Sequence, residues 1–214
     1  MVTKTQHTVP NTERTFCYRC RMSTPVLTEK RPSEARERLL ATASDLFYRE
    51  GIHAVGVDRV VIESAVTRAT FYRHFPSKED LIEAYLDRED AMIREQVAAA
   101  REHESSPDEL LEILIQGIAD DVTFNHTRGC PFINASAEYP DASSPVRVAV
   151  REHRGWFKNE LRDALAAAGR PDAAGAAAAL VLLRDAALVG GYLDGPDAMR
   201  DTFVATARTV AGLS

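Results

Sequence analysis

The side chains best suited to chemistry lie between Thr67 and Lys78, in the stretch TRATFYRHFPSK. Arg68 can form two hydrogen bonds with a guanine edge, and the methyl groups of Thr67 and Thr70 can contact thymine methyls. Backbone amides in the first turn of a helix also attract phosphate. These residue types indicate a segment that reads DNA, although an isolated run of charges is as often a solvated helix face.

An enzyme is the main alternative, because the sequence contains residues of the types that form thiol or metal sites. The candidates are His126, Cys130, Glu138 and His153. Their spacing does not place a histidine and an acid one helical turn apart, and there is no glycine-rich phosphate loop or nucleophile elbow. We therefore expect no catalytic site, no cofactor and no metal. A helical interaction module that does not bind DNA is a third possibility.

The net charge of −6 is unevenly distributed along the chain. Residues 1–80 contain 13 Lys and Arg against 10 Asp and Glu, net +3, whereas residues 81–214 contain 13 against 22, net −9. A mildly basic N-terminal part on an acidic body suits a protein that offers one end to a polyanion. The bias is small, so it supports the DNA interpretation without deciding it.

The N-terminal 30 residues show no apolar periodicity, which predicts a disordered tail. Cys17 and Cys20 form a C-x-x-C pair there, but a zinc site needs about four ligands and only His7 is near. Met22 is an alternative start, so residues 1–21 need not belong to the native protein.

Composition also bears on the compartment in which the chain works. The N-terminus lacks the apolar core of a secretory signal, and three cysteines suit a reducing cytoplasm better than a disulfide framework. The most apolar stretch, 173–192, carries Arg184 and Asp185. A membrane span needs about 20 residues with few or no charges, so we expect a cytoplasmic protein without a membrane partner.

Three short helices are predicted after the tail, at about 34–50, 57–64 and 67–75. Ser33 and Thr67 are suitable N-caps, Gly51 ends the first helix, and apolar residues recur three and four positions apart. Only Ala65 and Val66 separate the second and third helices. That gap is too short for the pair to fold flat, so the two helices must cross steeply as a helix-turn-helix.

The rest of the chain also has a helical pattern. Pro76 ends the third helix, and Ser77 with Asp80 forms a capping box that starts a long helix to about Glu104. Further helix starts are marked by prolines at positions 107, 145, 171 and 196, and a short helix is expected between Phe132 and Tyr139. No strand pattern is present, so the sequence predicts an all-α fold of about nine helices.

The segment Gly51–Leu81, GIHAVGVDRVVIESAVTRATFYRHFPSKEDL, resembles the DNA-binding domain of TetR-family transcriptional regulators along its whole length without a gap. The matching features are the apolar anchors, the pair Phe71 and Phe75, and the capped fourth helix. The resemblance implies a three-helix DNA-binding domain at 31–78 and a helical domain at 79–214 that binds an effector and dimerises. The tail at 1–30 would lie outside both domains.

The resemblance also assigns roles to side chains. It gives Tyr72, His74 and Lys78 contacts with backbone phosphate, while Arg73 adds charge and Arg36 a further positioning contact. With the base-reading positions, the expected DNA-binding residues are Arg36, Thr67, Arg68, Ala69, Thr70, Tyr72, Arg73, His74 and Lys78.

Two positions depart from the family pattern. The family usually has glycine at the turn where this chain has Ala65, and a small alanine at the helix crossing where this chain has Val61. An alanine in a left-handed turn costs about 1 kcal/mol, so the turn should be tolerated with a slightly altered crossing.

In the C-terminal body, the resemblance implies a homodimer through helices near 145–168 and 171–192. The second of these is apolar nearly all round, as a buried interface helix should be, although an ordinary internal helix would look similar. The segment 126–139 resembles one that borders the effector cavity in a branch of the family. The expected ligand-binding residues are Phe124, Cys130, Phe132, Asn134, Glu138 and Trp156.

The sequence therefore predicts a regulator that binds double-stranded operator DNA as a homodimer. By family habit, we expect a repressor that leaves a near-palindromic operator when an unknown small molecule binds.

Overall fold

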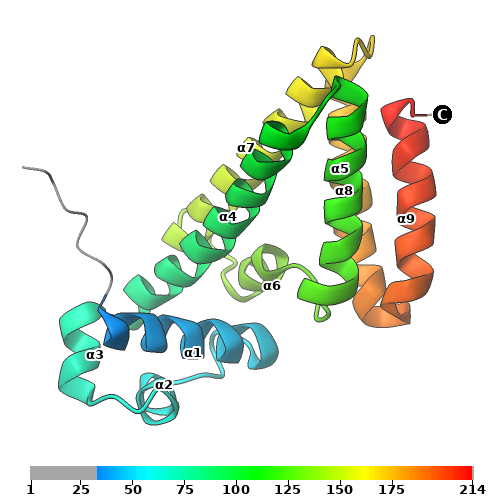
Figure 1. Cartoon of the computed structure of the whole chain (residues 1–214). Coiled ribbons are helices and arrows are strands. Elements are labelled where there is room, and N and C mark those ends of the chain that lie inside the picture. Colours follow the sequence, from blue (N-terminus) through cyan, green and yellow to red (C-terminus); the bar gives the residue numbers. More distant parts are fainter. Residues whose placement is uncertain (1–32, 214) are drawn as a thin grey trace, which may run out of the picture. The chain divides into compact units, whose positions relative to one another are not determined.

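Nine α-helices and one short π-helix make up the described part of the chain, residues 33–213, in a computed structural model (Figure 1). No strand occurs in these residues, which confirms the all-α prediction. They belong to the unit Pro32–Ser214. The tail at 1–30 and its Cys17–Cys20 pair lie outside the described residues.

The first three helices form a small unit, here called the head: α1 (Glu34–Glu50), α2 (Val57–Glu63) and α3 (Arg68–His74). Ser33 caps α1, its hydroxyl accepting the amide of Arg36 at 3.2 Å. Gly51 ends α1 with φ 97°, where a Cβ would lie 3.2 Å from the carboxylate of Glu138. The helix boundaries agree with the predicted ones to within a residue.

The turn between α2 and α3 is strained at Ala65, which has φ 52° and is the only residue other than glycine with a positive φ in the described chain. Its amide donates to the Ile62 carbonyl at 3.2 Å, and the next amide, of Val66, donates to the Val61 carbonyl at 3.3 Å. These bonds hold the backbone in the left-handed region despite the methyl group. The left-handed turn predicted from the sequence is confirmed.

Replacing Ala65 with glycine should therefore raise the free energy of unfolding by about 1 kcal/mol, because glycine adopts this conformation without a steric penalty. Urea unfolding measures the change. Ala69→Gly, on the exposed face of α3, is the matched control and should lower stability by about 1 kcal/mol. A loss of stability in both variants would contradict a left-handed turn at position 65.

The body follows with seven further elements. Ser77 and Asp80 form the predicted capping box of α4. The Ser77 amide donates to the Asp80 carboxylate at 2.8 Å, and the Asp80 amide donates to the Ser77 hydroxyl at 3.1 Å. Asp172 caps α8, which begins at Ala173, two residues after the predicted start at Pro171. The π-helix, η1, was not predicted. The elements are α4 (Lys78–His103), α5 (Pro107–Asp120), η1 (Asp121–Asn125), α6 (Pro131–Glu138), α7 (Pro145–Ala167), α8 (Ala173–Asp194) and α9 (Pro196–Ala211).

Within the body, α4 lies along α7, and α8 packs between α7 and α9 (Figure 1). Among the described residues, α8 is the one helix whose length and apolar composition would suffice to cross a membrane. Only 33% of its most apolar stretch of 18 residues is buried inside the chain. The exposed fractions of Leu182 and Leu193 are both 69%, so this helix leaves an apolar face uncovered.

Candidate functional site

The third helix of the head turns its aromatic residues inward and its polar residues outward. Phe71 is completely buried, and Phe75 is 2% exposed. The Thr67 hydroxyl caps the helix by accepting the Thr70 amide at 3.1 Å. The outward residues are Thr67, Arg68, Ala69, Tyr72 and Arg73. A short helix that buries two rings and exposes small polar and basic side chains at its start has the form of a groove-reading helix.

Arg68 is paired inside the free head. Its guanidinium contacts the carboxylate of Asp58 on α2, and both side chains are well exposed, at 61% and 67%. His74, near the other end of α3, contacts the Ser33 hydroxyl through Nε2 at 3.0 Å. The contact between Ser33 and His74 joins the end of α3 to the start of α1.

Arg36 and Lys78 lie at the edge of the head and are both half-buried. The Arg36 guanidinium lies over the Phe75 ring, 5.1 Å from its centre. Lys78 donates to the Ile52 carbonyl at 2.6 Å, and burial lowers the pKa of its amine. In the free protein the hydrogen bond from Lys78 therefore stabilises the turn after α1, in addition to the positive charge that Lys78 adds to this surface.

Two sets of hydrogen bonds join the head to the body at the end of α1. The Tyr48 hydroxyl donates to the Gly129 carbonyl at 3.0 Å and accepts the Arg128 amide at 2.7 Å. Glu138, on α6, accepts the amides of Ile52 and His53 at 2.8 and 2.6 Å. A displacement of the 126–130 loop or of α6 must therefore move the end of α1.

His126 links the same loop to α4 and η1. Its side chain is 5% exposed and lies 3.3 Å from the Glu89 carboxylate through Nε2 and 2.8 Å from Asp121 through Nδ1. The Nδ1 contact lies off the hydrogen-bond direction, so it acts as an ion pair. Burial alone would lower the pKa of His126, but the two carboxylates outweigh burial and raise it to about 9.

The raised pKa predicts a dependence of stability on pH. A group with a pKa of 6.5 in the unfolded chain and about 9 in the folded chain stabilises fully below pH 6.5 and loses that contribution as pH rises through 9. The free energy of unfolding should fall by up to about 3 kcal/mol between pH 6 and pH 9. In His126→Gln, urea unfolding over this range should give a much flatter profile; an equally steep fall would contradict the role of His126.

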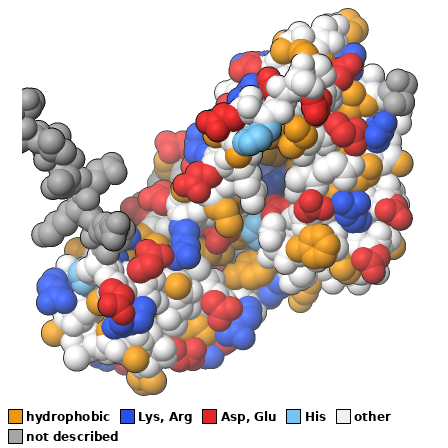
Figure 2. Space-filling view, in the orientation of Figure 1, with side chains coloured by type: hydrophobic (Ala, Val, Ile, Leu, Met, Phe, Trp, Pro, Cys, Tyr) orange, Lys and Arg blue, Asp and Glu red, His pale blue; other side chains and the backbone are white. Residues whose placement is uncertain are grey.

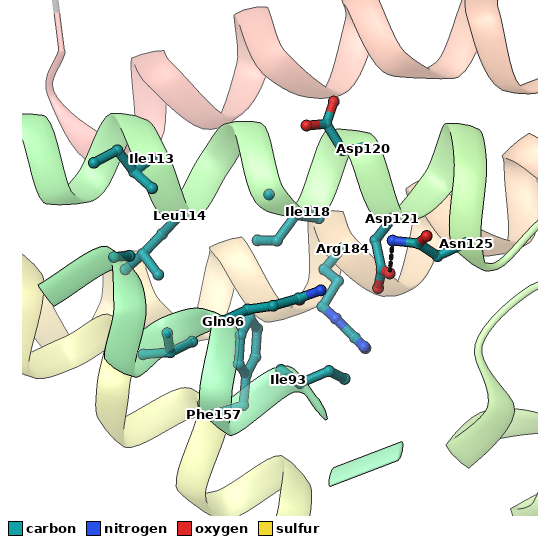
Figure 3. A pocket seen from close by; sticks show the side chains of 13 residues that line it. Ile93, Gln96, Ile113, Leu114, Ile118, Asp120, Asp121, Asn125, Phe157 and Arg184 are labelled. Carbon is teal, nitrogen blue, oxygen red and sulfur yellow. Dashed lines mark hydrogen bonds between the residues drawn. The ribbon is translucent and has the colours of Figure 1, made fainter. Parts of the chain in front are cut away.

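A cavity of about 350 Å³ lies inside the body, between α4, α5, η1, α7 and α8. Figure 2 shows the molecule hollowed between α4 and α5, with a basic side chain deep in the hollow. Arg184 reaches into the cavity from α8, and Gln96 points toward it from α4 (Figure 3). The apolar lining residues are Ile93, Val97, Ala100, Ile113, Leu114, Ile118 and Phe157. The size and the mostly apolar wall are those of a small-molecule site.

Known proteins resemble the chain over most of this structure. The model for bacterial regulatory proteins of the TetR family matches residues 39–85, and that for the tetracycline-repressor-like C-terminal domain matches residues 108–180. A crystal structure of SCO4454, a TetR-family transcriptional regulator from Streptomyces coelicolor, is 47% identical, covering 84% of this chain and 95% of that chain with a TM-score of 0.81. The chain belongs to the TetR family.

Two TetR-type regulators of Bacillus subtilis are more distant relatives. YxaF, named an uncharacterized HTH-type transcriptional regulator, is 28% identical over 58% of this chain and 66% of its own length, just under two thirds. LmrA, named an HTH-type transcriptional regulator, is 26% identical over 60% of this chain and 72% of its own length. The protein is therefore a TetR-family DNA-binding transcriptional regulator, and TetR-family proteins are not enzymes.

The structure brings the expected DNA-binding residues of this TetR-family head to one region around α3. Five of them are exposed, while Arg36, Thr70, His74 and Lys78 are half-buried. The exposed residues include all the candidates for base reading except Thr70, whose hydroxyl lies 2.9 Å from that of Thr67.

The six expected ligand-binding residues are dispersed, and none lines the 350 Å³ cavity. Phe132 is buried and stacks on His153 at 3.7 Å, while Asn134 donates to the Arg128 carbonyl at 3.1 Å. Glu138 accepts a hydrogen bond from the Ile52 amide of the head, and the Arg94 guanidinium lies over the Trp156 ring. Cys130 contacts Arg184 from behind the wall, and Phe124 borders a second, shallower hollow of about 340 Å³ beside α1.

The residues that do line the cavity include several that sequence reasoning missed, namely Gln96, Asp121, Asn125 and Arg184. Arg184 had a visible signal, since a charge in the middle of an apolar helix must find a partner or a cavity. The π-helix that places Asp121 and Asn125 in the wall had none, although such insertions are frequent at functional sites.

Proposed function

We propose that the protein is a homodimeric repressor that binds a near-palindromic operator and leaves it when a small molecule occupies the cavity between α4, α5, α7 and α8. The observation that carries the DNA part is the outward face of α3. Arg68 and the two threonines stand at the start of this helix, where side chains meet base edges in a major groove. Since operator DNA lies in the cytoplasm of a bacterium, we place the protein there.

The contacts with the operator divide into two kinds. Arg68, Thr67 and Thr70 read base edges, with Ala69 leaving room for a thymine methyl. The remaining residues, Arg36, Tyr72, Arg73, His74 and Lys78, contact phosphate and fix the register of the helix.

The dimer forms through the uncovered face of α8. Gly175, Ala179, Leu182, Ala186, Val189 and Leu193, here called the α8 stripe, recur at alternating spacings of four and three residues. Their spacing is that of a helix-packing seam, and none of the six is buried in the single chain. Two copies related by a two-fold axis would bury this stripe against itself.

The second helix of the interface is better supplied by α9 than by α7, the helix at 145–168 expected from the sequence. The exposed face of α7 carries charged residues: Arg151, Glu152, Lys158, Arg162 and Asp163. The exposed face of α9 carries small residues at helical spacing: Ala198, Thr202, Ala205 and Thr209. Small side chains allow two helices to approach closely, which supports a bundle of α8 and α9 from each protomer.

The effector acts through a series of contacts that leads from the cavity wall to the head. Asp121 lines the cavity and pairs with His126, which contacts Glu89 on α4 and lies against the Tyr48 ring of α1 at 5.8 Å. A ligand that shifts η1 therefore shifts the end of α1. A coupling of about 1–3 kcal/mol between the two sites would weaken operator binding about 5- to 150-fold.

A structure with the same fold supports a small-molecule site in the body. The crystal structure of a putative transcriptional regulator from Saccharomonospora viridis, 22% identical over 80% of this chain with a TM-score of 0.69, is of a complex with choline. In the present chain the cavity contains an arginine, so a cation such as choline is not the expected ligand.

Selection of bound sequences from random DNA with the purified protein tests the DNA part. The expected result is two inverted half-sites whose centres lie about one helical turn, ~34 Å, or a multiple of it apart. A single unpaired half-site, or no enriched sequence, would count against the proposal. In vitro transcription from the selected operator then tests repression, with activation as the opposite outcome.

A further inference from the structure

Arg184 is a buried charge without a close partner of opposite charge. The residue is 4% exposed, and it lies in the middle of α8 at the wall of the cavity. Its nearest polar contacts are long: 3.6 Å to the Cys130 sulfur and 3.6 Å to the Asp185 carboxylate. The guanidinium also lies 5.2 Å from the centre of the Phe157 ring. A guanidinium with five donors in a buried position requires acceptors that these contacts do not provide.

The carboxylates nearest to Arg184 already have other cations. Asp185 accepts two hydrogen bonds from Arg154, at 2.9 and 2.6 Å. Asp121 pairs with His126 at 2.8 Å. Within residues 33–213, no carboxylate oxygen lies within hydrogen-bond distance of Arg184, and its one ion pair, at 3.6 Å, is with Asp185, a carboxylate that it shares with Arg154, so its positive charge is only partly compensated.

Asp120, the other acid of the wall, is likewise paired and points away from the cavity (Figure 3). It accepts a hydrogen bond from Arg200 of α9 at 2.8 Å. His153, behind Phe157, has its pKa lowered to about 4 by burial, which outweighs its contact with Asp90, so it adds no charge near neutral pH. Arg184 is therefore the one cationic side chain among the described residues that line the cavity.

The rest of the wall decides what kind of anion fits. Ile113 and Leu114 line the opposite end of the cavity from Asp121 and Asn125, and Ile118 lies between the two ends (Figure 3). Inorganic phosphate or chloride would leave this aliphatic surface uncovered. A molecule with an apolar body and one acidic end would cover this aliphatic surface and pair with Arg184. A cavity of about 350 Å³ has room for a small molecule of this kind.

We propose that the effector is an apolar carboxylic acid whose carboxylate pairs with the Arg184 guanidinium while its hydrocarbon body fills the space between α4 and α5. This inference names the chemical class of the ligand and rests on the proposed role of the cavity. A planar carboxylate matches the donor geometry of arginine and can form two parallel hydrogen bonds with it.

The direct test is binding to the full-length protein without DNA, by calorimetry and by thermal shift. The probes are straight-chain monocarboxylates of six to twelve carbons and their ω-phenyl counterparts, each beside its primary amide, with choline and inorganic phosphate as further probes. We expect at least one acid to bind more than about tenfold tighter than its amide, with no stabilisation by choline. Equal binding of acid and amide, equal stabilisation by phosphate alone, or no acid binding below about 1 mM would overturn the proposal.

Arg184→Met provides the matched variant, because it keeps an unbranched side chain about as long as the aliphatic part of arginine and removes the charge. The ligand-free variant should unfold at the same temperature as the wild type or higher, since a weakly paired buried charge destabilises the fold. Its preference for acid over amide should disappear. Arg101→Met, which breaks an exposed pair with Glu160, should retain the preference. Loss of stability in Arg184→Met together with an unchanged acid preference would overturn the proposal.

The proposed ligand class and the proposed function can fail independently of each other. If an acid binds through Arg184 but operator affinity does not change, the ligand class stands and release by this ligand fails. If no acid binds while operator binding is normal, the inference fails and the regulator remains.

Discussion

Ala186→Glu is expected to leave the protein monomeric and to weaken binding to the full operator by about a hundredfold or more. Ala186 lies exposed at the centre of the α8 stripe, so glutamate does not disturb the core of the single chain and favours the helix. In the dimer, two like charges would meet across the two-fold axis. Without the second head, the gain from linked binding, about 10²- to 10⁴-fold, is lost. Sedimentation equilibrium and operator titration measure the two effects.

Asn159→Glu, on the exposed charged face of α7, is the control for this prediction. It should leave both the dimer and operator binding unchanged. Dissociation by Asn159→Glu with no effect of Ala186→Glu would place the interface on α7 and refute the α8 stripe.

Arg68→Ala should relax the base preference at one position of each half-site and weaken binding to the preferred sequence by about 1–3 kcal/mol. Binding to unrelated sequences should change little, because the Arg68 side chain is exposed and paired only with Asp58 in the free head. Competition titrations with operators that vary one base pair at a time measure the effect. If all sequences weaken equally, Arg68 contacts phosphate instead of a base.

Lys78→Ala is the complementary variant for that experiment. It should weaken binding to every sequence similarly and reduce the salt slope by about one unit. Since Lys78 also donates to the Ile52 carbonyl, its thermal unfolding must be recorded in parallel. If Lys78→Ala is still folded at the temperature of the binding measurement, its weaker binding reflects a lost phosphate contact and not a destabilised head.

The head could be predicted closely because its determinants are local in sequence. The caps at Ser33, Thr67 and Ser77 act within three residues, and the burial of Phe71 and Phe75 follows from their spacing on one short helix. The left-handed turn at Ala65 could also be predicted, because the family that the segment resembles usually has glycine at this position.

The cavity could not be predicted in the same way, because five elements distant in sequence contribute to its wall. The family resemblance suggested the segment 126–139, but the structure uses Tyr48, Arg128 and Glu138 to join head to body. Arg184 was visible as a charge in an apolar helix, yet its partners are determined by packing and not by its neighbours in the chain.

The Arg68–Asp58 pair has a consequence for how the regulator searches a genome. In the proposed base-reading role, Arg68 must leave Asp58 before it can reach a base edge, and an exposed pair of this kind is worth about 0.5 kcal/mol. A guanine edge offsets that loss, whereas a wrong base does not. Residence on each of about a million or more competing sites is thereby shortened roughly twofold, so more of the protein is free to reach its target.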